Sequence, residues 1–82
     1  MNMWSYNAVY NRGKERGLQT AHRLKERGKE LTMNTARLAE IDSRNEAFTI
    51  DFVSSINSSS NADDLWEEYE MGVRAGIKCV LG

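Results

Sequence analysis

A short pattern that occurs twice, 59 residues apart, most constrains how this chain can fold. In each copy an aromatic residue is followed by glycine at the third and seventh positions and by an aliphatic residue at the eighth. The two copies are Tyr10, Gly13, Gly17, Leu18 and Tyr69, Gly72, Gly76, Ile77. On a helix these four positions share one face. Glycine inside a helix costs about 1 kcal/mol relative to alanine, so the pattern predicts close approach of another backbone.

The repeated pattern therefore predicts a glycine-lined helix–helix seam. Its members would be two aromatics and four glycines: Tyr10, Gly13, Gly17, Tyr69, Gly72 and Gly76. Small residues four positions apart let helical backbones approach closely. The two glycine pairs could meet within one chain, or each could meet its own copy across a two-fold axis. A core this small favours a homodimer slightly over a monomer.

Composition suits one small helical domain over residues 1–82. The chain is 40% hydrophobic and 28% charged, and it contains no proline. Stretches rich in Ala, Leu, Glu, Lys and Arg favour helices over tight turns. We predict an all-α fold, either a small three-helix bundle or a long helical hairpin followed by a C-terminal helix.

Periodicity predicts helices over residues 5–31, 35–56 and 61–80, with a serine-rich loop at 57–60. The first would bury a stripe of mostly small residues: Tyr6, Tyr10, Gly13, Gly17, Ala21, Leu24, Gly28 and Leu31. The second would bury five apolar residues: Leu38, Ile41, Phe48, Phe52 and Ile56. The third would bury Leu65, Tyr69, Gly72, Val73, Gly76, Ile77 and Val80, with Trp66 at the edge.

Polar residues predict where these helices begin. The first helix would start near Ser5 or Asn7, and Ser60 or Asn61 would cap the last. Asn61 with Asp64 three residues later is close to a capping box. The second helix would be capped by one of three residues: Thr32, Asn34 or Thr35.

A seven-residue repeat supports a different arrangement, in which one long helix runs through residues 5–56. The repeat consists of Leu24, Leu31, Leu38, Asn45 and Phe52. In a long helix Asn45 would be a polar residue in an apolar seam that sets register or oligomeric state. On a short amphipathic helix it would point to solvent, and the sequence leaves both readings open.

Charge is unevenly distributed along the chain. Residues 12–30 hold seven basic and three acidic residues, whereas residues 31–82 hold four basic and nine acidic ones. The halves could attract each other, or the basic segment could face an anionic partner. Five acids near the start of the last helix suit its dipole and could also mimic phosphates: Asp63, Asp64, Glu67, Glu68 and Glu70.

No motif for catalysis, metal binding or cofactor binding occurs. One cysteine, Cys79, and one histidine, His22, cannot form a tetrahedral zinc site within one chain. The serines lack a glycine elbow and an adjacent base, and there is no phosphate loop. We therefore expect no enzyme activity and no cofactor. The sequence also lacks a membrane span and a signal peptide, which predicts a cytoplasmic location.

Residues 69–77 resemble the Gly-x-x-Ala-Gly helix of small ribosome-associated modulation factors, through Gly72, Ala75 and Gly76. The resemblance covers nine residues, and the segment lacks the strong positive charge of those proteins, so no function is carried over. In type, the chain is similar to the short accessory proteins of bacteriophages and mobile elements, which occupy a host protein's surface.

These observations predict a non-enzymatic protein–protein interaction module, a regulator or inhibitor that binds a host macromolecule. Aromatic and arginine residues dominate interface energies, and the candidates for partner binding are Trp4, Tyr6, Arg12, Arg16, Arg23, Arg27 and Trp66. The alternative is a nucleic-acid- or ribosome-associated protein that uses the basic face of residues 12–29. The interleaved glutamates and the pI near 5.8 weigh against that alternative.

Overall fold

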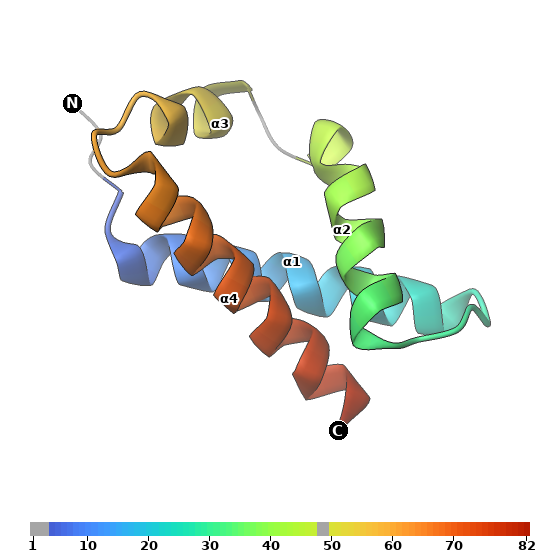
Figure 1. The fold of residues 1–82 in the computed structure, drawn as a ribbon. Coiled ribbons are helices and arrows are strands. Elements are labelled where there is room, and N and C mark those ends of the chain that lie inside the picture. Colours follow the sequence, from blue (N-terminus) through green and yellow to red (C-terminus); the bar gives the residue numbers. More distant parts are fainter. Residues whose placement is uncertain (1–3, 48–49) are drawn as a thin grey trace.

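The computed structural model describes residues 4–47 and 50–82, without the side chains of residues 45–50. The described residues contain no strand and form four helices: α1 (Tyr6–Glu26), α2 (Met33–Ala47), α3 (Ile50–Asn57) and α4 (Ala62–Leu81). The molecule measures 42 × 23 × 15 Å along its principal axes. Figure 1 shows α1 and α4 crossing, with α2 and α3 arranged around them. The prediction of an all-α fold is confirmed.

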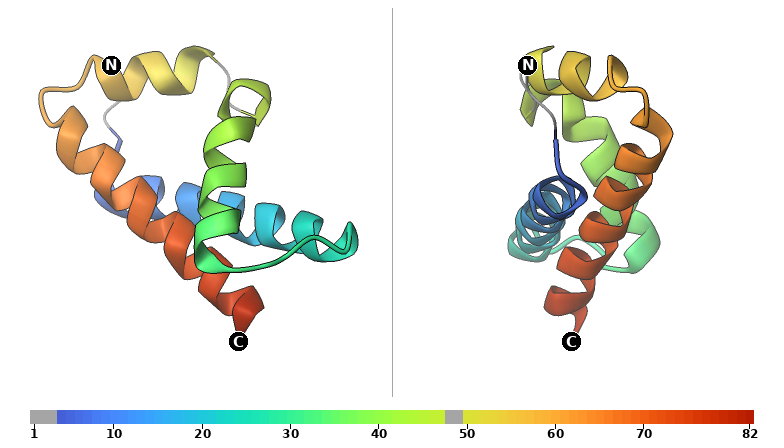
Figure 2. Two further views of the ribbon diagram at one scale, coloured as in Figure 1. Left: turned by 45° about the vertical axis from the view of Figure 1, so that its right-hand side comes forward. Right: turned by 90° about the vertical axis from the view of Figure 1, so that its left-hand side faces the viewer.

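Helices α1 and α4 form the centre of the fold, and they cross with their N-terminal ends on the same side (Figure 2). Asn61 Nδ2, at the start of α4, donates a hydrogen bond to the Tyr6 hydroxyl, at the start of α1, over 3.3 Å. A Cβ atom added to Gly13 would collide with the carbonyl group of Tyr69 in α4. In return, a Cβ atom on Gly72 would collide with the carbonyl group of Tyr10 in α1. The two backbones are thus in direct contact.

The second glycine pair repeats this exchange one turn further along. A Cβ atom on Gly17 would collide with the Val73 carbonyl, and one on Gly76 with the Lys14 carbonyl. Each contact maps onto its counterpart by a shift of 59 residues, so the seam has a local two-fold symmetry. The two glycine pairs meet within one chain, and the predicted glycine-lined seam is confirmed.

Helix α1 begins as predicted but ends earlier. Ser5 is the N-cap, and its hydroxyl accepts a hydrogen bond from Ala8 N at 3.0 Å. At the other end Gly28 has φ +68°, and the backbone N–H of Lys29 donates to the Leu24 carbonyl at 3.0 Å. This is the Schellman motif, which ends a helix at a left-handed glycine. The predicted end at residue 31 and a buried position for Gly28 were therefore wrong.

Helix α2 has its own start, which excludes one long helix through residues 5–56. The Thr32 hydroxyl accepts from Thr35 N at 3.1 Å, and the Thr35 hydroxyl accepts from Thr32 N at 2.9 Å. This reciprocal pair is a capping box with threonine at both positions. Of the three residues proposed as caps, Thr32 is the one at the N-cap. The side chain of Asn45 lies outside the described residues.

The predicted helix over residues 35–56 appears as two described helices, α2 and α3. Its predicted apolar face is only partly buried. Phe52 and Ile56 lie in the core, whereas Leu38 and Ile41 are exposed, so burial of these two was a wrong prediction. The remaining member of that face, Phe48, lies outside the described residues.

The aromatic part of the core lies between α3, the N-terminal part of α4 and Trp4, just before α1. Phe52 is its centre, with ring centroids 5.0 Å from Trp4 and 6.2 Å from both Trp66 and Tyr69. The buried face of α4 follows the prediction, except that Val80 is only half-buried. Asn61 is the N-cap of α4 but its side chain makes no capping hydrogen bond, so the predicted capping box with Asp64 is absent.

Candidate interaction surface on α2

Helix α2 buries charge against the rest of the molecule. Its inward side carries Ala36 and Glu40, both with no exposed area. A buried carboxylate is stable only when it is paired and hydrogen-bonded. Arg44, one turn along the helix, donates from Nε to both Glu40 oxygens at 3.1 and 3.2 Å, and from Nη2 to Oε1 at 2.9 Å. Tyr69 in α4 donates its hydroxyl to Glu40 Oε2 at 2.7 Å.

These contacts set the protonation of the groups involved. Burial, and then the hydrogen bond to Glu40, raise the pKa of Tyr69 well above its usual value. Burial alone would lower the pKa of Arg44, but its hydrogen bonds and charge attraction to Glu40 and Glu70 raise it. Tyr69 is therefore a neutral donor and Arg44 a fixed cation, and together they balance the Glu40 carboxylate.

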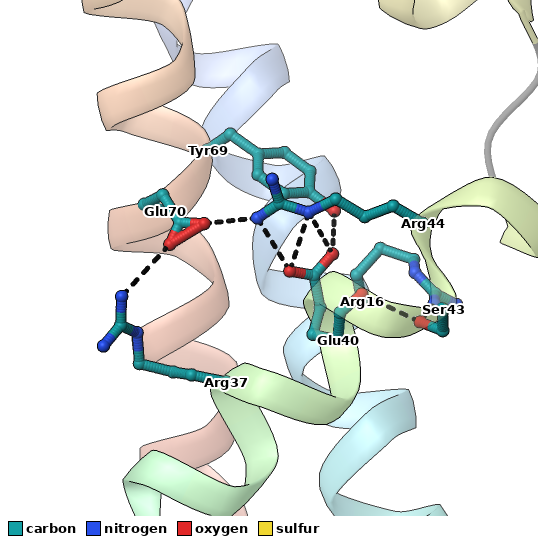
Figure 3. Close-up of polar contacts among 7 residues, drawn as sticks. All are labelled: Arg16, Arg37, Glu40, Ser43, Arg44, Tyr69 and Glu70. Atoms are coloured by element: carbon teal, nitrogen blue, oxygen red, sulfur yellow. Dashed lines mark hydrogen bonds and ion pairs between the residues drawn. The ribbon is translucent and has the colours of Figure 1, made fainter.

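An outer group of polar contacts fastens α2 to both helices of the seam (Figure 3). Glu70 in α4 pairs with Arg44 and also with Arg37, whose Nη2 lies 3.7 Å from Glu70 Oε2. From α1, Arg16 Nη2 donates to the Ser43 hydroxyl at 2.6 Å. The position of α2 therefore depends on directed polar contacts to both α1 and α4.

The opposite side of α2 carries two exposed aliphatic side chains, beside the exposed polar residues Asn34 and Asp42. Leu38 is 55% exposed and Ile41 is 43% exposed, and the two lie one turn apart on the same face. An isolated exposed leucine is ordinary in a folded protein. Here, however, the helix buries Glu40 and exposes its two large aliphatic side chains. A helix that packs only for stability turns such aliphatics inward. This outward face, Leu38 and Ile41, is the candidate interaction surface.

Three of the residues predicted to bind a partner instead make contacts within the molecule. Trp4 Nε1 donates to the Ser55 hydroxyl at 2.8 Å, and its ring packs edge-on against Phe52. Trp66 Nε1 donates to Asn57 Oδ1 at 2.9 Å. The guanidinium of Arg12 lies 4.3 Å above the Phe52 ring. These side chains hold α3 against α1 and α4.

The other four candidates divide into two groups. Arg16 is half-buried and bound to Ser43 and Gln19. Tyr6, Arg23 and Arg27 are exposed. Of the seam residues, Tyr10 is half-buried, and Tyr69 is buried with its hydroxyl bound to Glu40.

Among the described residues, the ion pairs gather around α2. They join Arg37 and Arg44 of α2 to Glu40 and Glu70. The acidic start of α4 lies beside Tyr6, at the N-terminal end of α1, whereas the exposed basic residues Arg23, Lys25, Arg27 and Lys29 lie at its C-terminal end. The two charge clusters thus occupy opposite ends of α1.

Sequence reasoning did not single out the network of Glu40, Arg44 and Glu70. The one available signal was the four-residue spacing of Glu40 and Arg44, which places them on one helix face. His22 and Cys79 are both exposed. Within the described part of the chain, no group of three His, Cys, Asp or Glu side chains is arranged to hold a metal ion.

Comparisons with protein-family models, curated proteins and solved structures gave no match. Among the described helices, none combines the length and apolar character needed to cross a lipid bilayer.

Proposed function

We propose that this chain is a non-enzymatic protein–protein interaction module that binds a partner protein through the outward face of α2. The observation that supports the proposal is that this helix buries Glu40 while it exposes Leu38 and Ile41. Covering exposed apolar area stabilises a complex by about 25 cal/mol per Å² before the costs of association are subtracted. A partner groove with an apolar floor would fit these two side chains.

The attachment of α2 supports the same role. Arg44 and Tyr69 hold Glu40 in a fixed position, so the helix presents Leu38 and Ile41 on a rigid support. Rigid presentation lowers the entropy lost on binding. The chain's small size and its likeness in type to bacteriophage accessory proteins make a host regulator or inhibitor, acting in the host cytoplasm, our preferred form of the proposal.

A capture experiment with matched variants tests this function. Immobilised wild-type protein, the double variant Leu38→Glu/Ile41→Glu and the control Met71→Glu would each be exposed to a nuclease-treated bacterial lysate. Met71 is 48% exposed on α4, so its variant adds a charge at a similar exposure elsewhere. We expect one dominant protein to be retained by wild type and control and lost with the double variant. Equal retention by all three would contradict the proposed surface.

Nucleic-acid or ribosome binding is the second candidate, and one observation favours it. The exposed cations Arg23, Lys25, Arg27 and Lys29 make no ion pair with the described residues. Phosphate contacts release counterions, so such binding would weaken about tenfold or more between low and moderate salt. Binding through Leu38 and Ile41 would change little with salt. Retention that disappears after nuclease treatment would also support this candidate.

A further inference from the structure

A polar pocket lies between the C-terminal half of α1 and the neighbouring helix α2. Its volume is about 380 Å³, within the range of small-molecule sites. It is lined by Thr20, Arg23, Leu24, Arg27, Ala39, Asp42 and Ser43. The interaction surface proposed above uses none of these residues.

Three charged side chains line this pocket without an ion-pair partner among the described residues. Arg23 lies in the last turn of α1 and Arg27, four residues later, is the C-cap of this helix, so both side chains line the same wall. Asp42 lies on the α2 side. The three side chains are exposed, and none forms an ion pair within 4.0 Å with a described residue. Two cations and one anion thus line the same cavity without contacting one another.

The inner part of the pocket adds a polar group and an apolar wall. Thr20 is 2% exposed, and its buried Oγ1 has no hydrogen-bond partner among the described residues. A buried hydroxyl without a partner is unfavourable. Leu24 and Ala39 supply carbon surface beside it. The pocket therefore offers cationic, carboxylate and apolar contacts.

We propose that this pocket binds a small phosphate ester that carries hydroxyl groups, of the class of nucleoside monophosphates. Paired guanidinium groups match the geometry of phosphate oxygens. The negative end of the α1 dipole carries only about half a charge, which the two arginines outweigh. Asp42 accepts hydrogen bonds from hydroxyls, which a bare phosphate lacks. Leu24 and Ala39 contact the flat, less polar part of the ligand.

Titrations followed by nitrogen–proton NMR test the proposal, using inorganic phosphate, adenosine 5′-monophosphate and adenosine as probes. We expect saturable shifts at the amides of Thr20, Arg23, Arg27 and Asp42 with the monophosphate. Adenosine, which lacks the charge, should bind at least about tenfold more weakly, since charge-assisted hydrogen bonds are lost. Inorganic phosphate should fall between the two. No saturable shift with the monophosphate would overturn the proposal.

Two variants that each remove one positive charge, inside or outside the pocket, test whether binding occurs in the pocket. Arg27→Gln should weaken binding about tenfold, whereas Lys25→Gln, on the same helix but outside the pocket, should change it less than about twofold. Asp42→Asn should weaken the monophosphate but not inorganic phosphate. All of these side chains are exposed, and the amide spectra would verify the fold.

Binding of a single-stranded oligonucleotide provides the contrasting result. If the oligonucleotide bound more tightly than the monophosphate and lost affinity equally with Arg27→Gln and Lys25→Gln, the pocket would have no specific role. The basic end of α1 would then act as a general phosphate-binding surface, and the proposed pocket ligand would be wrong.

Discussion

At the α1–α4 seam two helices meet through backbone atoms, whereas α2 is joined to both of them by charged and polar side chains. The seam has no space for one additional carbon at Gly13, Gly17, Gly72 or Gly76. The contacts of α2 depend on the charged Arg44 guanidinium and the protonated Tyr69 hydroxyl, which both donate to Glu40. The α1–α4 seam therefore depends on shape alone, whereas the contacts of α2 depend on charge and on pH.

Alanine substitution should break the seam most severely. Alanine favours an isolated helix by about 1 kcal/mol over glycine, yet Gly13→Ala or Gly72→Ala places a carbon against a carbonyl group of the facing helix. We expect more than about 4 kcal/mol of destabilisation, measured by chemical denaturation. Gly28→Ala is the control, because its Cβ would contact nothing and only its φ of +68° is strained, which costs about 1–2 kcal/mol. A seam variant less harmful than this control would contradict the backbone contact.

Loss of one charge should weaken the α2 attachment by a smaller amount. Arg44→Met leaves the Glu40 carboxylate buried without its cation, a change that typically costs about 3–5 kcal/mol. Because the Arg44 side chain remains 25% exposed, we expect about 2–3 kcal/mol. In the double variant Glu40→Met/Arg44→Met much of the loss should be recovered, since no unpaired charge remains. Denaturation of both variants measures the difference, and an equally unstable double variant would show that packing dominates.

High pH should reveal the Tyr69 contact. The pKa of Tyr69 is raised in the folded state, so the native protein binds this proton more tightly than the unfolded chain does. Its stabilising effect is complete below the ordinary tyrosine pKa of 10.0 and is lost as the pH rises above it. The slope approaches about 1.4 kcal/mol per pH unit. Tyr69→Phe should have a flatter stability profile between pH 10 and 12 than wild type, and parallel profiles would contradict the assignment.

Substitutions on the outward face of α2 should have the smallest effect on stability. Leu38→Glu and Ile41→Glu alter exposed side chains, so each should change the free energy of unfolding by less than about 0.5 kcal/mol. Thermal denaturation measures this change. A larger loss would mean that these side chains contribute to folding, and the argument for a partner surface would fail.

The sequence predicted the seam and α4 well because both depend on local periodicity. Glycines spaced four apart indicate a facing backbone. The four-residue spacing of Leu65, Tyr69 and Val73 places these side chains on one buried face of α4. Ser5 was likewise recognisable as a cap. Such signals lie within one or two turns of the chain.

Helix α2 could not be predicted in the same way. Leu38 and Ile41 have the spacing of a buried face, but the helix buries Glu40 instead. That choice depends on Tyr69, which is 29 residues away in sequence. Gly28 posed a related problem, since a glycine at helical spacing can line a seam or end the helix. In both cases contacts beyond the local window decide the outcome.

The large sequence separation of α1 and α4 affects how the protein folds during translation. Helix α1 precedes α4 in the chain, and positions in contact are far apart in sequence, 56 residues for Gly13 and Tyr69 and 62 for Tyr10 and Gly72. Closing so long a loop precedes most of the stabilising contacts, which slows folding. During translation α1 therefore leaves the ribosome with its glycine face uncovered, and it gains its partner only once α4 has emerged.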